Sequence, residues 1–114
     1  MAIKANLVID QGEDFSALID VTDAGGEVFD LTDYAVASEM RKNYAQSTPT
    51  ATFTASHNGE NGQILLQLSR DITKDIDPGR YLYDVEIKAP DPLDEVSRVV
   101  EGIITVTPGV TRSL

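Results

Sequence analysis

His57 is the one histidine of the chain, and it is the first candidate for acid–base chemistry because imidazole titrates near neutral pH. It lies beside a turn rich in glycine and asparagine at residues 58–62, so we expect a solvated loop residue. Catalysis would need a partner that positions the imidazole, and no triad pattern surrounds it. The absence of cysteine excludes disulfides, a thiolate zinc site and a cysteine nucleophile. We therefore predict no catalytic residue and no enzyme.

Acidic residues gather in three places, at residues 10–14, 71–77 and 91–95. Calcium takes about six to eight oxygen ligands, but none of these clusters has the spacing of an EF-hand loop. Asp71 is expected instead to cap a helical turn before Ile72. The glycines lie in turns between expected strands and form no phosphate-binding motif. We predict no metal site and no cofactor, and calcium binding by the acidic loops stays open.

Tyr81 opens an expected strand directly after the turn residues Pro78 and Gly79. This position is typical of a tyrosine corner, in which the hydroxyl bonds to backbone at one end of a sandwich. The alternative is an exposed aromatic ring on which a ligand stacks. We expect the corner.

Apolar and polar side chains alternate along most of the chain, which is typical of half-buried strands. Residues 70–77 are more polar and predict one helical turn, with Ile72 and Ile76 both facing inward. The last strand is expected to bend or bulge at Gly102. A helix is the alternative for the third strand, whose composition favours one. The expected strands cover residues 5–10, 14–22, 34–43, 50–56, 63–69, 80–89 and 95–107, with a short extended stretch at 28–32.

Short strands separated by turn residues roughly every 8–12 residues are typical of immunoglobulin-like domains. A chain of 114 residues is long enough for one domain with its own core. We therefore predict one all-β domain over residues 1–114, an immunoglobulin-like antiparallel β-sandwich of about seven strands. A small antiparallel barrel is the alternative.

The net charge of −10 disfavours nucleic acid as a partner, because phosphates would be repelled. The sequence has no apolar run of the length that a signal peptide or a membrane span needs. We expect synthesis in a cytoplasm and no membrane partner. We expect the acidic surface to serve solubility. The alternative is that it binds a basic partner.

Three stretches carry a resemblance to a known family. They are IDQGEDF and IDVTD at residues 9–15 and 19–23, FDLTDY and MRK at residues 29–34 and 40–42, and IDPGRYLYDV and VEGIITVTP at residues 76–85 and 100–108. In order and spacing they resemble a small β-sandwich domain of structural proteins in tailed bacteriophages, especially contractile-tailed phages of cyanobacteria. The pattern is similar to the N-terminal sandwich of phage baseplate upper proteins, and it covers nearly the whole chain.

The resemblance implies a non-catalytic virion structural protein, a component of the neck, tail, baseplate or fibre attachment, assembled in the host cytoplasm. It implies other virion proteins as partners and no small-molecule substrate, and the family has no catalytic residues to carry over. The chain ends at Leu114 without a receptor-binding domain, which argues against direct recognition of a host. We also expect a homo-oligomer, whose stoichiometry and symmetry the sequence leaves open.

We expect the interface at the long final strand, as a free sheet edge, and at the tail after Pro108. The alternative function is a carbohydrate- or calcium-binding sandwich that uses the acidic loops and an exposed tyrosine. The candidate interface residues are Arg98, Glu101, Val110, Thr111 and Arg112.

Overall fold

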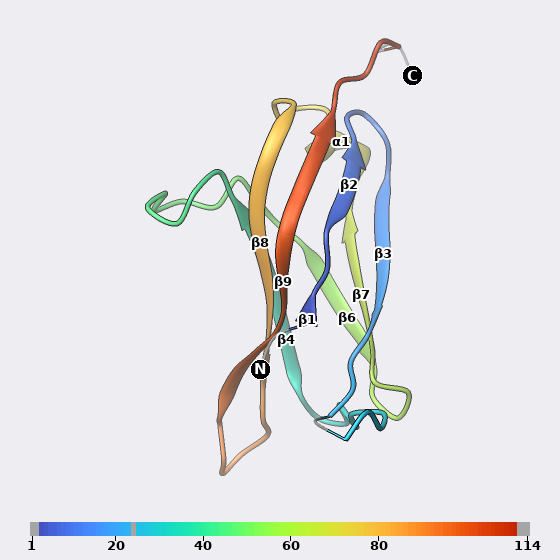
Figure 1. Cartoon of the computed structure of the whole chain (residues 1–114), viewed down its shortest axis with the longest axis vertical. Helices are drawn as coiled ribbons and strands as arrows, with labels where there is room; N and C mark the ends of the chain where they lie inside the picture. The colour runs from blue at the N-terminus through green and yellow to red at the C-terminus, as the bar shows by residue number, and fades with distance from the viewer. Residues whose placement is uncertain (1–2, 24, 112–114) are drawn as a thin grey trace.

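The computed structural model describes residues 3–23 and 25–111, which form two β-sheets and one short helix (Figure 1). The larger sheet has the strand order β1-β9-β8-β4-β5, with β2 also paired to β9, and the smaller sheet has the order β3-β7-β6. The elements are β1 (Ile3–Lys4), β2 (Leu7–Asp10), β3 (Phe15–Asp20), β4 (Ala35–Arg41), β5 (Ala51–Thr52), β6 (Thr54–Asn58), β7 (Gln63–Leu68), α1 (Arg70–Thr73), β8 (Gly79–Lys88) and β9 (Val96–Thr107).

The core lies between the two sheets, because alternate residues of the longer strands, such as β3, β7 and β8, face the other sheet. The alternation that predicts β7 and β8 is confirmed, and β4 is a strand rather than a helix. These observations confirm the predicted all-β, immunoglobulin-like sandwich. The inward-facing residues of β7 and β8, which belong to one buried cluster, are Ile64, Leu66, Leu68, Tyr81, Tyr83, Val85 and Ile87.

Strand β9 lies inside the larger sheet. It runs antiparallel to β8, and its other side pairs in parallel with β1 at Ile3 and with β2 at Leu7. These two parallel pairs differ from the expected antiparallel order, because the start of the chain lies beside its end. The prediction that residues 95–107 form a free edge is therefore wrong for residues 100–107. Among the described residues, 96–98 pair with β8 and have no strand on their other side.

The irregularity of β9 lies at Val99 and not at Gly102. Val85 pairs with Val100 whereas Glu86 pairs with Arg98, so Val99 is the extra residue of a β-bulge.

Gly102 is required for a different reason, which is the close approach of the segment between β1 and β2. A Cβ atom at this position would clash with the carbonyl oxygen of Ala5. Tyr83 lies opposite Gly102 on β8, and its hydroxyl donates a hydrogen bond of 2.6 Å to the same carbonyl. The N-terminal segment is thus fixed directly against β9.

The predicted helical turn is present but short, since α1 covers Arg70–Thr73. Ile76 is buried as expected, but the prediction for Ile72 is wrong because 43% of this residue is exposed. Thr73 takes the inward position, and its hydroxyl donates to the carbonyl of Glu13 at 2.7 Å. Within the described part of the chain, no helix is long and apolar enough to cross a membrane.

We expect Gly102→Ala to destabilise the protein by about 1–3 kcal/mol, because the added methyl group must push the Ala5 backbone away from β9. The control is Gly25→Ala, where the nearest atom to a new Cβ is Asp23 Oδ1 at an ordinary 3.4 Å. Urea unfolding measures both free energies. Equal stability of the two variants would contradict the close approach at Gly102.

Candidate functional site

His57 is part of β6 and ties this strand to the segment before β4. Its Nε2 lies 2.8 Å from the carbonyl oxygen of Tyr34, so this nitrogen carries the proton and donates it. Its Nδ1 is buried without a hydrogen-bond partner among the described residues. The prediction of a solvated loop residue is wrong, because β6 continues to Asn58 and places Ala55 and His57 on its half-buried face.

One carboxylate of the first acidic cluster bonds to backbone that is distant in the sequence. Asp14 Oδ1 accepts the backbone N–H of Arg70 at 2.8 Å, at the start of α1. The predicted cap at Asp71 is therefore wrong, and a residue distant in the sequence fills that role. Over residues 3–23 and 25–111, no group of three or more His, Asp or Glu side chains is placed to hold a metal ion.

Tyr81 forms the predicted tyrosine corner. Its hydroxyl donates to the carbonyl of Asp77, four residues upstream, at 2.6 Å. Burial raises the pKa of Tyr81, and the Lys42 ammonium lies 4.7 Å from the centre of its ring. This tyrosine holds one end of the sandwich together and is not available for ligand stacking.

A groove of about 540 Å³ lies on the solvent side of the larger sheet. Its floor contains Leu82, Gly102 and Ile103, and its wall is the β4–β5 loop, which carries Tyr44. Figure 1 shows this loop projecting away from the sheet. We call this surface the outer groove. It combines an apolar floor with an aromatic side chain that is 90% exposed.

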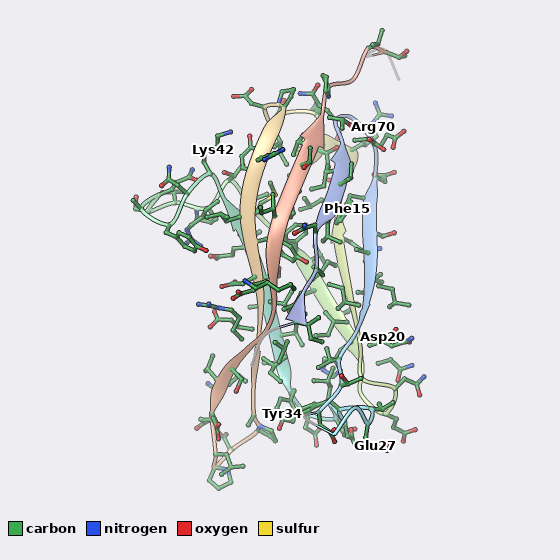
Figure 2. The ribbon with its side chains drawn as sticks, viewed as in Figure 1. Phe15, Asp20, Glu27, Tyr34, Lys42 and Arg70 are labelled. Carbon is green, nitrogen blue, oxygen red and sulfur yellow. The ribbon has the colours of Figure 1, made fainter. Side chains whose placement is uncertain are left out.

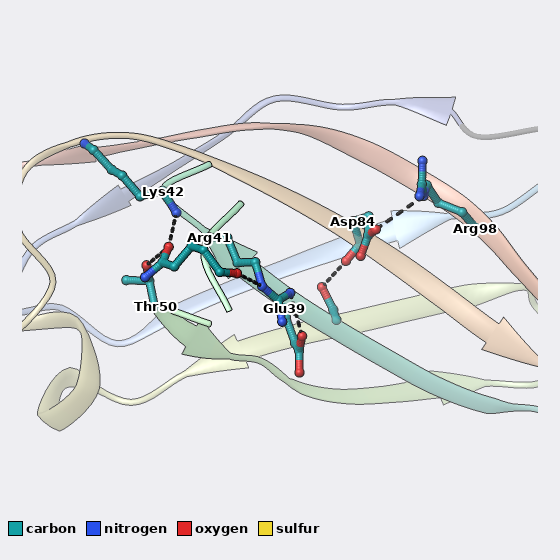
Figure 3. Close-up of polar contacts among 8 residues, drawn as sticks. Glu39, Arg41, Lys42, Thr50, Asp84 and Arg98 are labelled. Carbon is teal, nitrogen blue, oxygen red and sulfur yellow. Dashed lines mark hydrogen bonds and ion pairs between the residues drawn. The ribbon is translucent and has the colours of Figure 1, made fainter. Parts of the chain in front are cut away.

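The rim of the outer groove carries a chain of ion pairs centred on Glu101. Lys4 Nζ lies 2.7 Å from one carboxylate oxygen of Glu101, and Arg98 Nη1 lies 3.2 Å from the other. Arg98 Nε also lies 3.2 Å from Asp84 Oδ2 (Figure 3). The hydrogen bonds from Lys4 and Arg98 lower the pKa of Glu101. The structure thus places two of the predicted interface residues, Arg98 and Glu101, in direct contact.

The wall loop is held by polar contacts that do not involve Tyr44. Arg41 pairs with Glu39 at 2.8 Å, and its Nε donates to the carbonyl of Gln46 at 3.1 Å. The side-chain oxygen of Gln46 accepts the backbone N–H of Lys42 at 2.6 Å (Figure 3). Sequence reasoning missed Tyr44 as a site residue. The available signal was an aromatic residue in a polar loop directly after a strand.

The remaining predicted interface residues lie elsewhere. Val110 and Thr111 follow the far end of β9 and line a separate depression of about 750 Å³ beside Arg70 and Lys74. Val110 is 96% exposed. Arg112 lies outside the described residues. The five predicted interface residues therefore do not form one surface over the part of the chain that the structure describes.

Two solved structures with this fold are an internalin-like protein of Listeria monocytogenes, lmo2027, and the GspB Siglec domain. The match to the internalin-like protein has a TM-score of 0.53 at 17% identity, and it spans 93% of this chain and 28% of the internalin-like chain. The match to the GspB Siglec domain has a TM-score of 0.54 at 16% identity, and it spans 91% of this chain and 54% of the GspB chain. At such identities the likeness shows the fold alone. No protein-family model and no curated protein matches the chain.

We expect the carboxyl group of Glu101 to titrate below its ordinary value of 4.5, because Lys4 and Arg98 stabilise its anionic form. Since the folded-state pKa is the lower one, the contribution of Glu101 to stability is present above the ordinary value and is lost as the pH falls through the folded-state value. A side-chain NMR titration measures this pKa. In Arg98→Gln the pKa of Glu101 should rise toward 4.5, and an unchanged value would contradict the contact.

Proposed function

We propose that the chain is a non-catalytic structural protein that acts by protein–protein assembly and that a partner protein covers the outer groove. The observation that carries this proposal is the exposed ring of Tyr44 beside an apolar floor, with ion pairs along the rim. Protein interfaces commonly combine a buried aromatic residue, an apolar centre and a polar rim.

The position of Tyr44 makes it the main candidate contact residue. The loop that carries it is held by Arg41 and Gln46, so the ring is presented on a loop with fixed backbone contacts. A partner that covers the ring would gain roughly 2 kcal/mol from removing it from water. This gain corresponds to about a thirtyfold change in the dissociation constant.

The setting that we propose is the virion of a tailed bacteriophage, at the neck, tail, baseplate or fibre attachment, after assembly in the host cytoplasm. The resemblance of three sequence stretches to phage sandwich domains supports this setting. The partners would be other virion proteins or further copies of the chain. The ion pairs on the rim would then contribute mainly to specificity, because exposed pairs add little affinity.

We expect the chain in purified virions of the phage that encodes it, and we expect Tyr44→Ala to reduce its incorporation about thirtyfold when assembly is limited by affinity. Quantitative mass spectrometry of purified particles measures this amount. The control is Leu18→Ala, since Leu18 is 61% exposed on the smaller sheet. Light scattering of the purified chain tests whether copies associate through the same surface.

Two outcomes would contradict the proposal. A chain found in infected-cell lysate but never in purified particles would contradict the virion setting. Equal incorporation of the Tyr44→Ala and Leu18→Ala variants would contradict the outer groove as the interface. Urea unfolding of both variants checks that each keeps the stability of the wild type.

A carbohydrate-binding module is the second candidate, because three side-chain amides line the outer groove with Tyr44. These residues are Asn6, Asn43 and Gln46. Amides bond to hydroxyl groups as donors and acceptors, and an aromatic ring packs on apolar ligand faces. This candidate requires a thermal shift with a glycan, lost in Tyr44→Ala. No shift across a glycan panel would remove it.

A further inference from the structure

The first residues of β9 have one open side. The parallel strand β1 begins at Ile3, opposite Val100. Among residues 3–23 and 25–111, residues 96–98 therefore pair with β8 only, and the bulged Val99 pairs with no strand. Figure 1 shows the β8–β9 hairpin extending beyond the end of β1. We call residues 96–99 the open strip.

The backbone of Val96 faces this open side. At the end of the hairpin, the N–H of Ala89 donates to the carbonyl of Glu95 at 2.8 Å. Hydrogen-bonded and non-hydrogen-bonded pairs alternate along an antiparallel ladder, so the next pair, Lys88 with Val96, is non-hydrogen-bonded. The N–H and C=O of Val96 therefore point away from β8, where a further strand would reach them.

A second groove, of about 530 Å³, lies beside the open strip. The hairpin contributes Ile87, Leu93 and Val99 to its lining, and the β3–β4 connection contributes Val21 and Phe29. We call it the end groove. An open strand edge next to an apolar groove is the arrangement that accepts an extended peptide segment, whose alternate side chains fill the groove.

The loops around the end groove are acidic and contain no lysine or arginine. Figure 2 shows Asp20, Glu27 and Tyr34 at this end of the molecule. Arg98 lines the end groove, but its guanidinium is paired with Asp84 and Glu101, and Lys88 lies 3.9 Å from Asp94. A basic occupant would therefore be attracted to this end. The acidic residues at 20–34 and 90–95 are Asp20, Asp23, Glu27, Asp30, Asp33, Asp91, Asp94 and Glu95.

We propose that the open strip and the end groove bind an extended segment of a partner protein in which basic and apolar residues alternate. The segment adds to the larger sheet in line with β1 and bonds to the backbone of Val96. Its apolar side chains enter the end groove, and its basic side chains lie beside the acidic loops. A second copy of this chain fits less well, because a symmetric contact would bring the same acidic loops together.

The test uses the full chain and a fluorescent peptide of alternating lysine and valine, with binding measured by anisotropy. We expect saturable binding and about a tenfold loss of affinity in Val96→Pro, which removes the N–H that faces the segment. Val96→Thr keeps this N–H and is the matched control, with affinity within about twofold of the wild type. Both variants should unfold like the wild type, because proline is tolerated at an unpaired strand edge.

Tyr44→Ala should bind the peptide like the wild type, which separates this site from the outer groove. Equal affinity of Val96→Pro and the wild type would overturn the proposal, as would equal binding of a glutamate–valine peptide. A concentration-dependent dimer that excludes the peptide and is lost in Val96→Pro would also overturn it, in favour of a second copy as the occupant.

Discussion

The two-sided pairing of β9 is the constraint on which the rest of the structure depends. From Val100 to Val106 this strand pairs with β8 on one side, and its other side pairs with β1 at residues 100–101 and with β2 at residues 104–107. The N-terminal segment passes so close at Gly102 that no side chain fits there. The same close approach lies at Gly102, which lines the outer groove. Because β1 pairs with β9 from Val100 onward, residues 96–98 pair only with β8 in the part of the chain that the structure describes.

The two surfaces that result differ in electrostatics. On the outer groove, acidic and basic side chains neutralise one another in short ion pairs, so an occupant there depends on contact with Tyr44 and the apolar floor. Around the end groove, the loops carry carboxylates without lysine or arginine, so an occupant there is selected by positive charge. A chain with a net charge of −10 thus presents one nearly balanced face and one acidic end. This division favours two different partners over one partner that covers both surfaces.

The sequence predicts the features that depend on local pattern. Alternation identifies β7 and β8 with their inward residues, and the residues before Tyr81 identify the tyrosine corner. Features that depend on which strands meet are not readable from one sequence. Alternation has no direction, so it does not reveal that β2 runs parallel to β9. The need for Gly102 arises from Ala5, far away in the chain, and the exposure of Tyr44 depends on how its loop folds.

Amide hydrogen exchange along β9 of the isolated chain tests the two-sided pairing most directly, because each protected amide needs a bonded partner. Neighbouring residues of a strand direct their N–H groups to opposite sides. We expect slow exchange at consecutive residues such as Thr105 and Val106, which face β2 and β8 in turn. At the start of β9, we expect Ser97 to exchange slowly and Val96 to exchange rapidly. The account is a strand that is paired on both sides from Val100 onward and on one side only before Val100. Rapid exchange at Thr105, or strong protection at Val96, would contradict it.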